Sequence, residues 1–79
     1  MHSAQYDHYS MVIEWSQADE AYIVTVPELP GCRTHGASYE QAVSQGQDAI
    51  VSWISARQTS GRPIPVPRVY PEQKVLAKN

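Results

Sequence analysis

The chain has 79 residues, a formal net charge of −2 and a single cysteine, Cys32. This length allows one small domain with a marginal core, so self-association is a natural way to add stability. One cysteine excludes an intramolecular disulfide, which suits a reducing cytoplasm. The apolar runs are too short to span a bilayer and no secretory signal is present. We therefore expect a cytoplasmic protein that does not associate with a membrane. The acidic balance disfavours a nucleic-acid binder.

Two strands are predicted in the first third of the chain. Residues 1–8 are polar and are expected to be disordered. Aromatic and β-branched residues then predict strands at residues 9–15 and 21–26. The polar turn between them is too short for a crossover, so the two strands should pair as an antiparallel hairpin.

A third strand and one helix follow. Proline and glycine at residues 27–31 interrupt the pairing, and residues 32–35 predict a short strand. Ser38 and Gln41 have the spacing of a capping box, which marks the start of a helix. Apolar residues recur from there at three- and four-residue intervals, as expected of a helix lying on a sheet, and Gly61 is a good stop.

The segment Pro63-Ile64-Pro65-Val66-Pro67 predicts an edge strand. Its prolines leave one side without backbone donors, while Ile64 and Val66 can pair on the other side. Residues 68–79 are predicted to be a loosely ordered tail. The expected fold is therefore α+β, in the order β-β-β-α-β, with an antiparallel-based sheet and one helix packed on one face.

The motifs resemble a known family. The run YIVTVPELPGC at residues 22–32 is followed by Thr34, Gly36 and Ser38, and then by Glu40-Gln41-Ala42. Further matching positions are Ala49-Ile50, Trp53, Gly61 and Ile64-Pro65. Over roughly residues 9–67, the chain resembles the partial RNase H-like domain of the HicB antitoxins, so residues 9–67 are taken as one HicB-like domain.

The resemblance implies a protein-binding role. HicB proteins partner a HicA toxin, a small basic mRNA-cleaving protein, and cover its active site; members also self-associate. We therefore expect a non-enzymatic antitoxin, or an orphan relative of one, without a cofactor and forming a dimer or tetramer. Typical members carry a C-terminal DNA-binding domain, but only residues 68–79 follow Pro67 here. DNA binding is therefore not expected without an additional domain.

Three acidic residues are candidate contacts for a basic partner. Asp19 and Glu20 fall in the predicted hairpin turn, and Glu28 precedes the third strand. Carboxylates in these loops would steer a cationic toxin toward the domain. Aromatic residues are expected mainly in the core, namely Tyr22, Tyr39 and Trp53. The outer sheet face and its exposed edge are the predicted surfaces of self-association.

Two other functions are alternatives. A residual metal-dependent nuclease on an RNase H-like scaffold would draw on Glu14, Glu40 and Asp48, but Glu14 is predicted on the face away from the helix. A small nucleic-acid-binding domain would use the sheet face. Neither a Cys32–His35 nucleophile nor a zinc site is expected: that pair points to opposite strand faces, and the possible zinc ligands lack clustered spacing. Those ligands would be His2, His8, Cys32 and His35.

Overall fold

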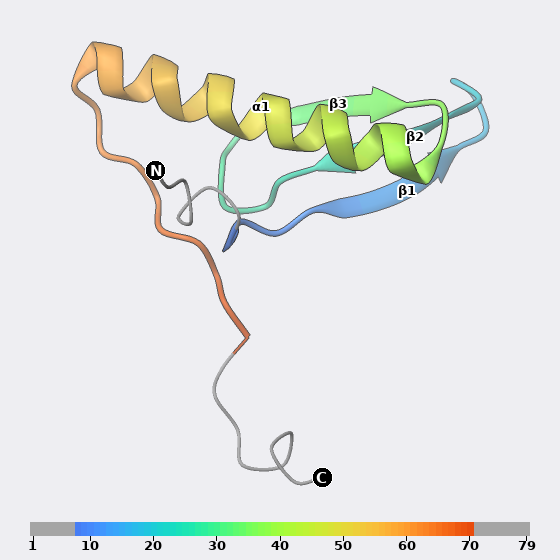
Figure 1. Cartoon of the computed structure of the whole chain (residues 1–79), viewed down its shortest axis with the longest axis horizontal. Coiled ribbons are helices and arrows are strands. Elements are labelled where there is room, and N and C mark those ends of the chain that lie inside the picture. Colours follow the sequence, from blue (N-terminus) through green and yellow to red (C-terminus); the bar gives the residue numbers. More distant parts are fainter. Residues whose placement is uncertain (1–7, 71–79) are drawn as a thin grey trace, which may run out of the picture.

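The computed structural model describes residues 8–70 and contains three strands followed by one helix (Figure 1). The strands are β1 (Val12–Ser16), β2 (Ala21–Thr25) and β3 (Arg33–Gly36), and the helix is α1 (Tyr39–Ser60). The sheet has the order β1-β2-β3 with both pairs antiparallel, and α1 lies across one face of it. The α+β class and the β-β-β-α order are thus confirmed, with strand bounds that differ from the predicted ones by at most three residues.

Alternation along the strands separates a helix-facing side from an open side. Val24 is fully buried beneath α1, and its register partners are Ile13 on β1 and Thr34 on β3. Residues one position away in each strand point the other way. The open side therefore carries Val12, Glu14, Ile23, Thr25, Arg33 and His35, which are exposed or half-buried.

The predicted edge strand does not form in this structure. Residues 62–70 have no regular secondary structure and run away from the sheet as an extended arm (Figure 1). The segment is held near its own domain by isolated contacts: Arg57 Nη1 donates to the Pro63 carbonyl at 3.2 Å, and the Tyr9 hydroxyl donates to the Pro65 carbonyl. These bonds use carbonyls at the proline positions and do not align the segment with a neighbouring strand. The expectation of a strand at residues 63–67 is corrected accordingly.

Both helix ends use the predicted capping chemistry. The Ser38 hydroxyl accepts the Gln41 N–H at 3.1 Å, and the Gln41 side-chain oxygen accepts the Ala37 N–H at 2.6 Å. At the other end Gly61 adopts a left-handed φ of 71°, which lets its N–H and that of Arg62 bond to the last turn. This arrangement satisfies helix carbonyls that would otherwise lack donors.

The core lies between the C-terminal half of α1 and the loop after β2. Leu29 is fully buried in this loop, and Ile50 and Ile54 reach it from the helix. The remaining buried members are Tyr9, Val26 and Cys32, with Met11, Ala49, Trp53 and Ile64 packed at the margin. Trp53 also donates its indole N–H to the Pro30 carbonyl at 3.0 Å, which ties the loop to the helix.

Two glycines let the helix approach the sheet closely. A Cβ at Gly36 would lie 2.5 Å from the Ala42 backbone nitrogen, and one at Gly46 would lie 2.7 Å from the Met11 sulfur and 3.1 Å from a Val24 methyl carbon. At Gly36 the obstacle is rigid backbone, whereas at Gly46 the nearest atom is the end of a flexible side chain. Gly36 therefore fixes how close the first turn of α1 comes to β3.

The two predicted terminal segments fall mainly outside the described residues. Residues 1–7 and 71–79 are not described, so neither the disordered start at 1–8 nor the tail at 68–79 is tested beyond His8 and residues 68–70. Within residues 8–70, no helix combines the length and the apolar character that crossing a membrane requires.

Gly36→Ala should destabilise the domain by about 2 to 3 kcal/mol, because the added methyl group forces β3 and α1 apart. Urea denaturation followed by tryptophan fluorescence measures this loss. His35→Ala, one residue earlier on the open side, is the matched control and should change stability by no more than about 0.5 kcal/mol. Equal stability of Gly36→Ala and the wild type would contradict the close approach.

Candidate protein-interaction surface

The hairpin turn after β1 presents two exposed carboxylates. The Asp19 N–H donates to the Ser16 hydroxyl oxygen at 3.2 Å, and that hydroxyl donates to Asp19 Oδ2 at 3.1 Å. Glu20 adopts a φ of 53°, a left-handed conformation that costs a side-chain-bearing residue about 1 kcal/mol. Both acidic residues are exposed. The turn is therefore a defined structure that carries negative charge at its tip.

An aromatic cluster lies beside this turn. The rings of Trp15 and Tyr22 meet edge to face at 5.1 Å, and those of Tyr22 and Tyr39 are 4.4 Å apart. Trp15 is 50% exposed and Tyr39 is 63% exposed, so a large apolar surface remains in contact with water. The expectation that Tyr39 belongs to the core is wrong: it occupies the first turn of α1, beyond the edge of the buried region.

The acidic turn and the aromatic cluster share one end of the domain. Trp15 is near the end of β1, Tyr22 is near the start of β2, and the turn with Asp19 and Glu20 joins these strands. Tyr39 begins α1 at the same end of the sheet, on the right in Figure 1. We call these five residues the acidic–aromatic end. Carboxylates next to exposed aromatic faces suit lysine and arginine side chains, which bind to both.

Glu28 has a different role from the other two acidic candidates. Its carboxylate accepts the Ser10 N–H at 3.1 and 3.2 Å, the Ser10 hydroxyl at 2.9 Å and the Arg68 N–H at 2.8 Å. It thereby joins three segments that are far apart in the chain: the residues before β1, the loop after β2 and the arm. Its predicted contact with a partner remains a prediction, but the structure already uses this carboxylate inside the domain.

The pKa of Glu28 reflects this environment. Burial acts to raise the pKa of the carboxyl, but the hydrogen bonds from the Arg68 backbone, its own backbone and Ser10 favour the charged form. Together they outweigh burial and hold the pKa below its ordinary value. The charged carboxylate is therefore the form that holds the three segments together.

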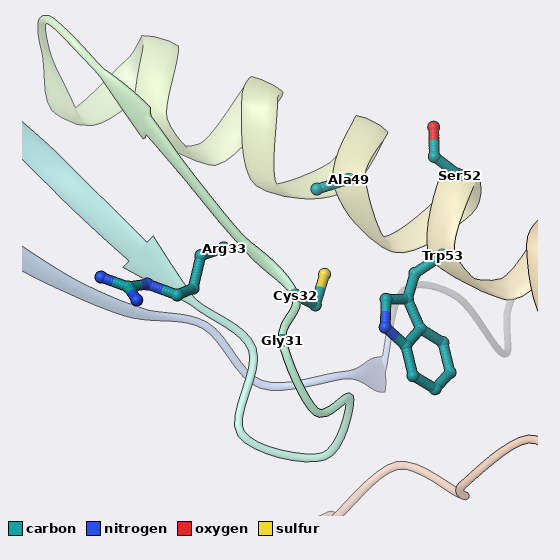
Figure 2. A pocket seen from close by; sticks show the side chains of 6 residues that line it. All are labelled: Gly31, Cys32, Arg33, Ala49, Ser52 and Trp53. Carbon is teal, nitrogen blue, oxygen red and sulfur yellow. The ribbon is translucent and has the colours of Figure 1, made fainter.

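A shallow hollow of about 300 Å³ lies between the loop after β2 and the helix (Figure 2). In Figure 2 the Cys32 sulfur points toward α1 and Trp53, while the Arg33 side chain points away. Burial raises the pKa of the Cys32 thiol, which disfavours the reactive thiolate. The guanidinium carbon of Arg57 lies 4.2 Å from the centre of the Trp53 ring, so the ring packs against this side chain. The residues that line the hollow therefore do not suggest a catalytic site.

The alternative sites are not assembled by the fold. Glu14 lies on the open side of the sheet, whereas Glu40 and Asp48 are exposed on the helix, which packs against the opposite side. Cys32 is buried in the core and His35 is exposed on the open side. Within the described part of the chain, no cluster of three or more potential metal ligands occurs. His2, one of the possible zinc ligands, lies outside the described residues.

Comparison with known proteins identifies the family of the chain. Residues 9–76 match the family described as the HicB_like antitoxin of bacterial toxin-antitoxin systems, so the chain belongs to the HicB-like antitoxin family. It is similar to UPF0150 protein Ta0767 of Thermoplasma acidophilum, with 35% identity over 54 residues, which cover 68% of this chain and 78% of that protein. No solved structure matches the chain.

Glu28→Gln should destabilise the domain by about 1 kcal/mol at pH 7, since the neutral amide accepts these hydrogen bonds more weakly. A carboxyl whose pKa is lowered by folding stabilises the protein above its ordinary pKa, and this contribution is lost as the pH falls through the folded value. The gap between wild type and variant should thus close below about pH 4.

Urea denaturation of both proteins from pH 7 downward measures this gap. Glu14→Gln provides the control, because its side chain is exposed on the open side of the sheet. A gap that stays constant over the whole range would refute the role given to the Glu28 carboxylate.

Proposed function

We propose that this antitoxin-family protein binds and masks a small, basic HicA-type toxin, and that the acidic–aromatic end is its main contact surface. Family membership carries the first part of the proposal. The second part is supported by two exposed carboxylates beside two half-exposed or exposed aromatic rings. Aromatic side chains are common binding hot spots, and carboxylates speed the approach of a cationic partner.

The proposed mechanism is steric and electrostatic occlusion. An mRNA-cleaving toxin must present cationic groups to phosphate, and a negatively charged protein surface can occupy the same place. No bond is made or broken in this mechanism, so the antitoxin acts without catalysis and without a cofactor. We further propose that it acts in the cytoplasm, where the mRNA substrate of such a toxin is found, and that it forms a homo-oligomer.

Asp19→Lys should slow association with the HicA-type toxin roughly tenfold at low salt, because it reverses a charge at the proposed contact. Stopped-flow or surface-based kinetics with the purified toxin measure the association rate. Asp48→Lys makes the same change of charge at an exposed helix position and should have a much smaller effect. The difference should narrow as salt screens the charges. Equal effects of the two variants would argue that the turn is not at the interface.

Trp15→Ala should weaken toxin binding by at least about tenfold, as expected for an aromatic residue at the centre of a contact. The ring is half-exposed, so the domain should remain folded, which circular dichroism can verify. Titration calorimetry gives the affinity. Val51→Ala removes exposed apolar surface elsewhere, on α1, and serves as the control with unchanged affinity. Unchanged binding by Trp15→Ala would exclude the aromatic cluster from the interface.

A further inference from the structure

The arm at residues 62–70 exposes apolar side chains. Val66 is 74% exposed, Val69 64% and Tyr70 74%, although each is preceded by residues fixed to the domain. Ile64 at the base of the arm packs against the core. A short segment with a fixed base and an apolar, exposed continuation is poorly suited to water and well suited to a second protein surface.

The backbone of the arm is hydrogen-bonded to its own domain at some residues and unbonded at others. The carbonyls of Pro63 and Pro65 accept hydrogen bonds from Arg57 and Tyr9 of the same chain. The N–H groups of Ile64 and Val66 donate to nothing within residues 8–70. The prolines thus face their own domain, where missing donors carry no penalty, and the Arg68 N–H donates to Glu28. The N–H groups of Ile64 and Val66 remain available to another strand.

The outer edge of β1 offers the complementary groups. The Val26 N–H donates to the Cys32 carbonyl at 3.0 Å, which fixes the hydrogen-bonded pairs between β2 and β3. Antiparallel pairs alternate, so Tyr22 and Val24 bond to β3, while Ile23 and Thr25 bond to β1. The backbone groups of Ile13 and Trp15 must then point away from β2, toward the free edge.

The free edges of the sheet differ in character. Beside the edge of β1, Val12 is 42% exposed on the open side and Trp15 is half-exposed on the other side. The edge strand β3 instead carries the polar side chains of Arg33 and His35 on its open side. The apolar arm therefore fits β1 better than β3. The lengths agree as well, because β1 has five residues and so has the segment 63–67.

We propose that residues 63–67 pair with the outer edge of β1 in a second copy of this chain, so that two copies exchange arms. In its own domain the arm passes the residues before β1, where Tyr9 and the Glu28 carboxylate hold it, and then runs away from the sheet (Figure 1). The edge of β1 is left without a strand among the described residues. Reciprocal exchange fills both edges and closes the assembly with two-fold symmetry.

This proposal specifies the surface of the self-association proposed above, and the chain alone tests it, without any toxin. Sedimentation equilibrium should show the wild type as a self-associated species and Val66→Pro as a monomer, because proline removes the N–H that donates to the second copy. Val66→Thr keeps that N–H and the branched side chain, so it should still associate. A monomeric wild type, or a Val66→Pro variant that associates normally, would overturn the proposal.

Disulfide trapping tests the same contact independently of how well Val66→Pro folds. Chains carrying Val12→Cys and chains carrying Val66→Cys, both with Cys32→Ala, are mixed and oxidised. With the arm running parallel to β1, the Val66 side chain lies on the same face of the sheet as Val12. The expected product is then a disulfide between the two kinds of chain, and Ser44→Cys in place of Val12→Cys should give none. If the double variant Val12→Cys/Val66→Cys instead closes its disulfide within a monomer, the arm belongs to its own sheet and the exchange is refuted.

Discussion

The close contact of α1 with the sheet at Gly36 and Gly46 determines where the other parts of the domain lie. The first turn of α1 lies directly against the end of β3. The approach is so close that a Cβ at Gly36 would strike the Ala42 backbone. The first residue of the helix, Tyr39, is thereby placed on Tyr22 and beside the hairpin turn. The same contact covers only one side of a three-stranded sheet. The open side and the outer edge of β1 remain uncovered because a single helix packs on one face of the sheet.

Two regions of the surface carry the proposed contacts: the acidic–aromatic end, and the arm together with the outer edge of β1. At one end of the sheet, charge and aromatic surface are combined in a form that suits a basic protein. Near the opposite end, the Glu28 carboxylate joins the start of the chain to the arm and sets the point from which the arm leaves the domain. Trp15 belongs to the acidic–aromatic end and also lies beside the outer edge of β1, so the proposed toxin contact and the proposed arm contact adjoin at this residue.

The helix and strands could be predicted from local sequence signals, whereas the candidate interaction surface depends on contacts between residues far apart in the chain. The N-cap at Ser38 and the stop at Gly61 are short-range features, and both formed as predicted. The reciprocal bond of Gln41 goes to the Ala37 N–H, one residue before the N-cap. The hydrogen bonds of Glu28 join residues 18 and 40 positions apart, which no local pattern encodes. Tyr39 is expected in the core because it is aromatic, but the residue type does not tell how far the sheet extends beneath the first turn of α1. Residues 63–67 have the composition of an edge strand, but composition does not tell which strand they pair with.

The central claim is that this protein neutralises a toxin by covering its active surface, and titration of the toxin's ribonuclease activity tests it most directly. Cleavage of an mRNA substrate by the HicA-type toxin is measured with increasing amounts of the purified antitoxin. We predict complete, stoichiometric inhibition that weakens as salt screens the acidic–aromatic end. Full cleavage in the presence of excess, folded protein at low salt would contradict it.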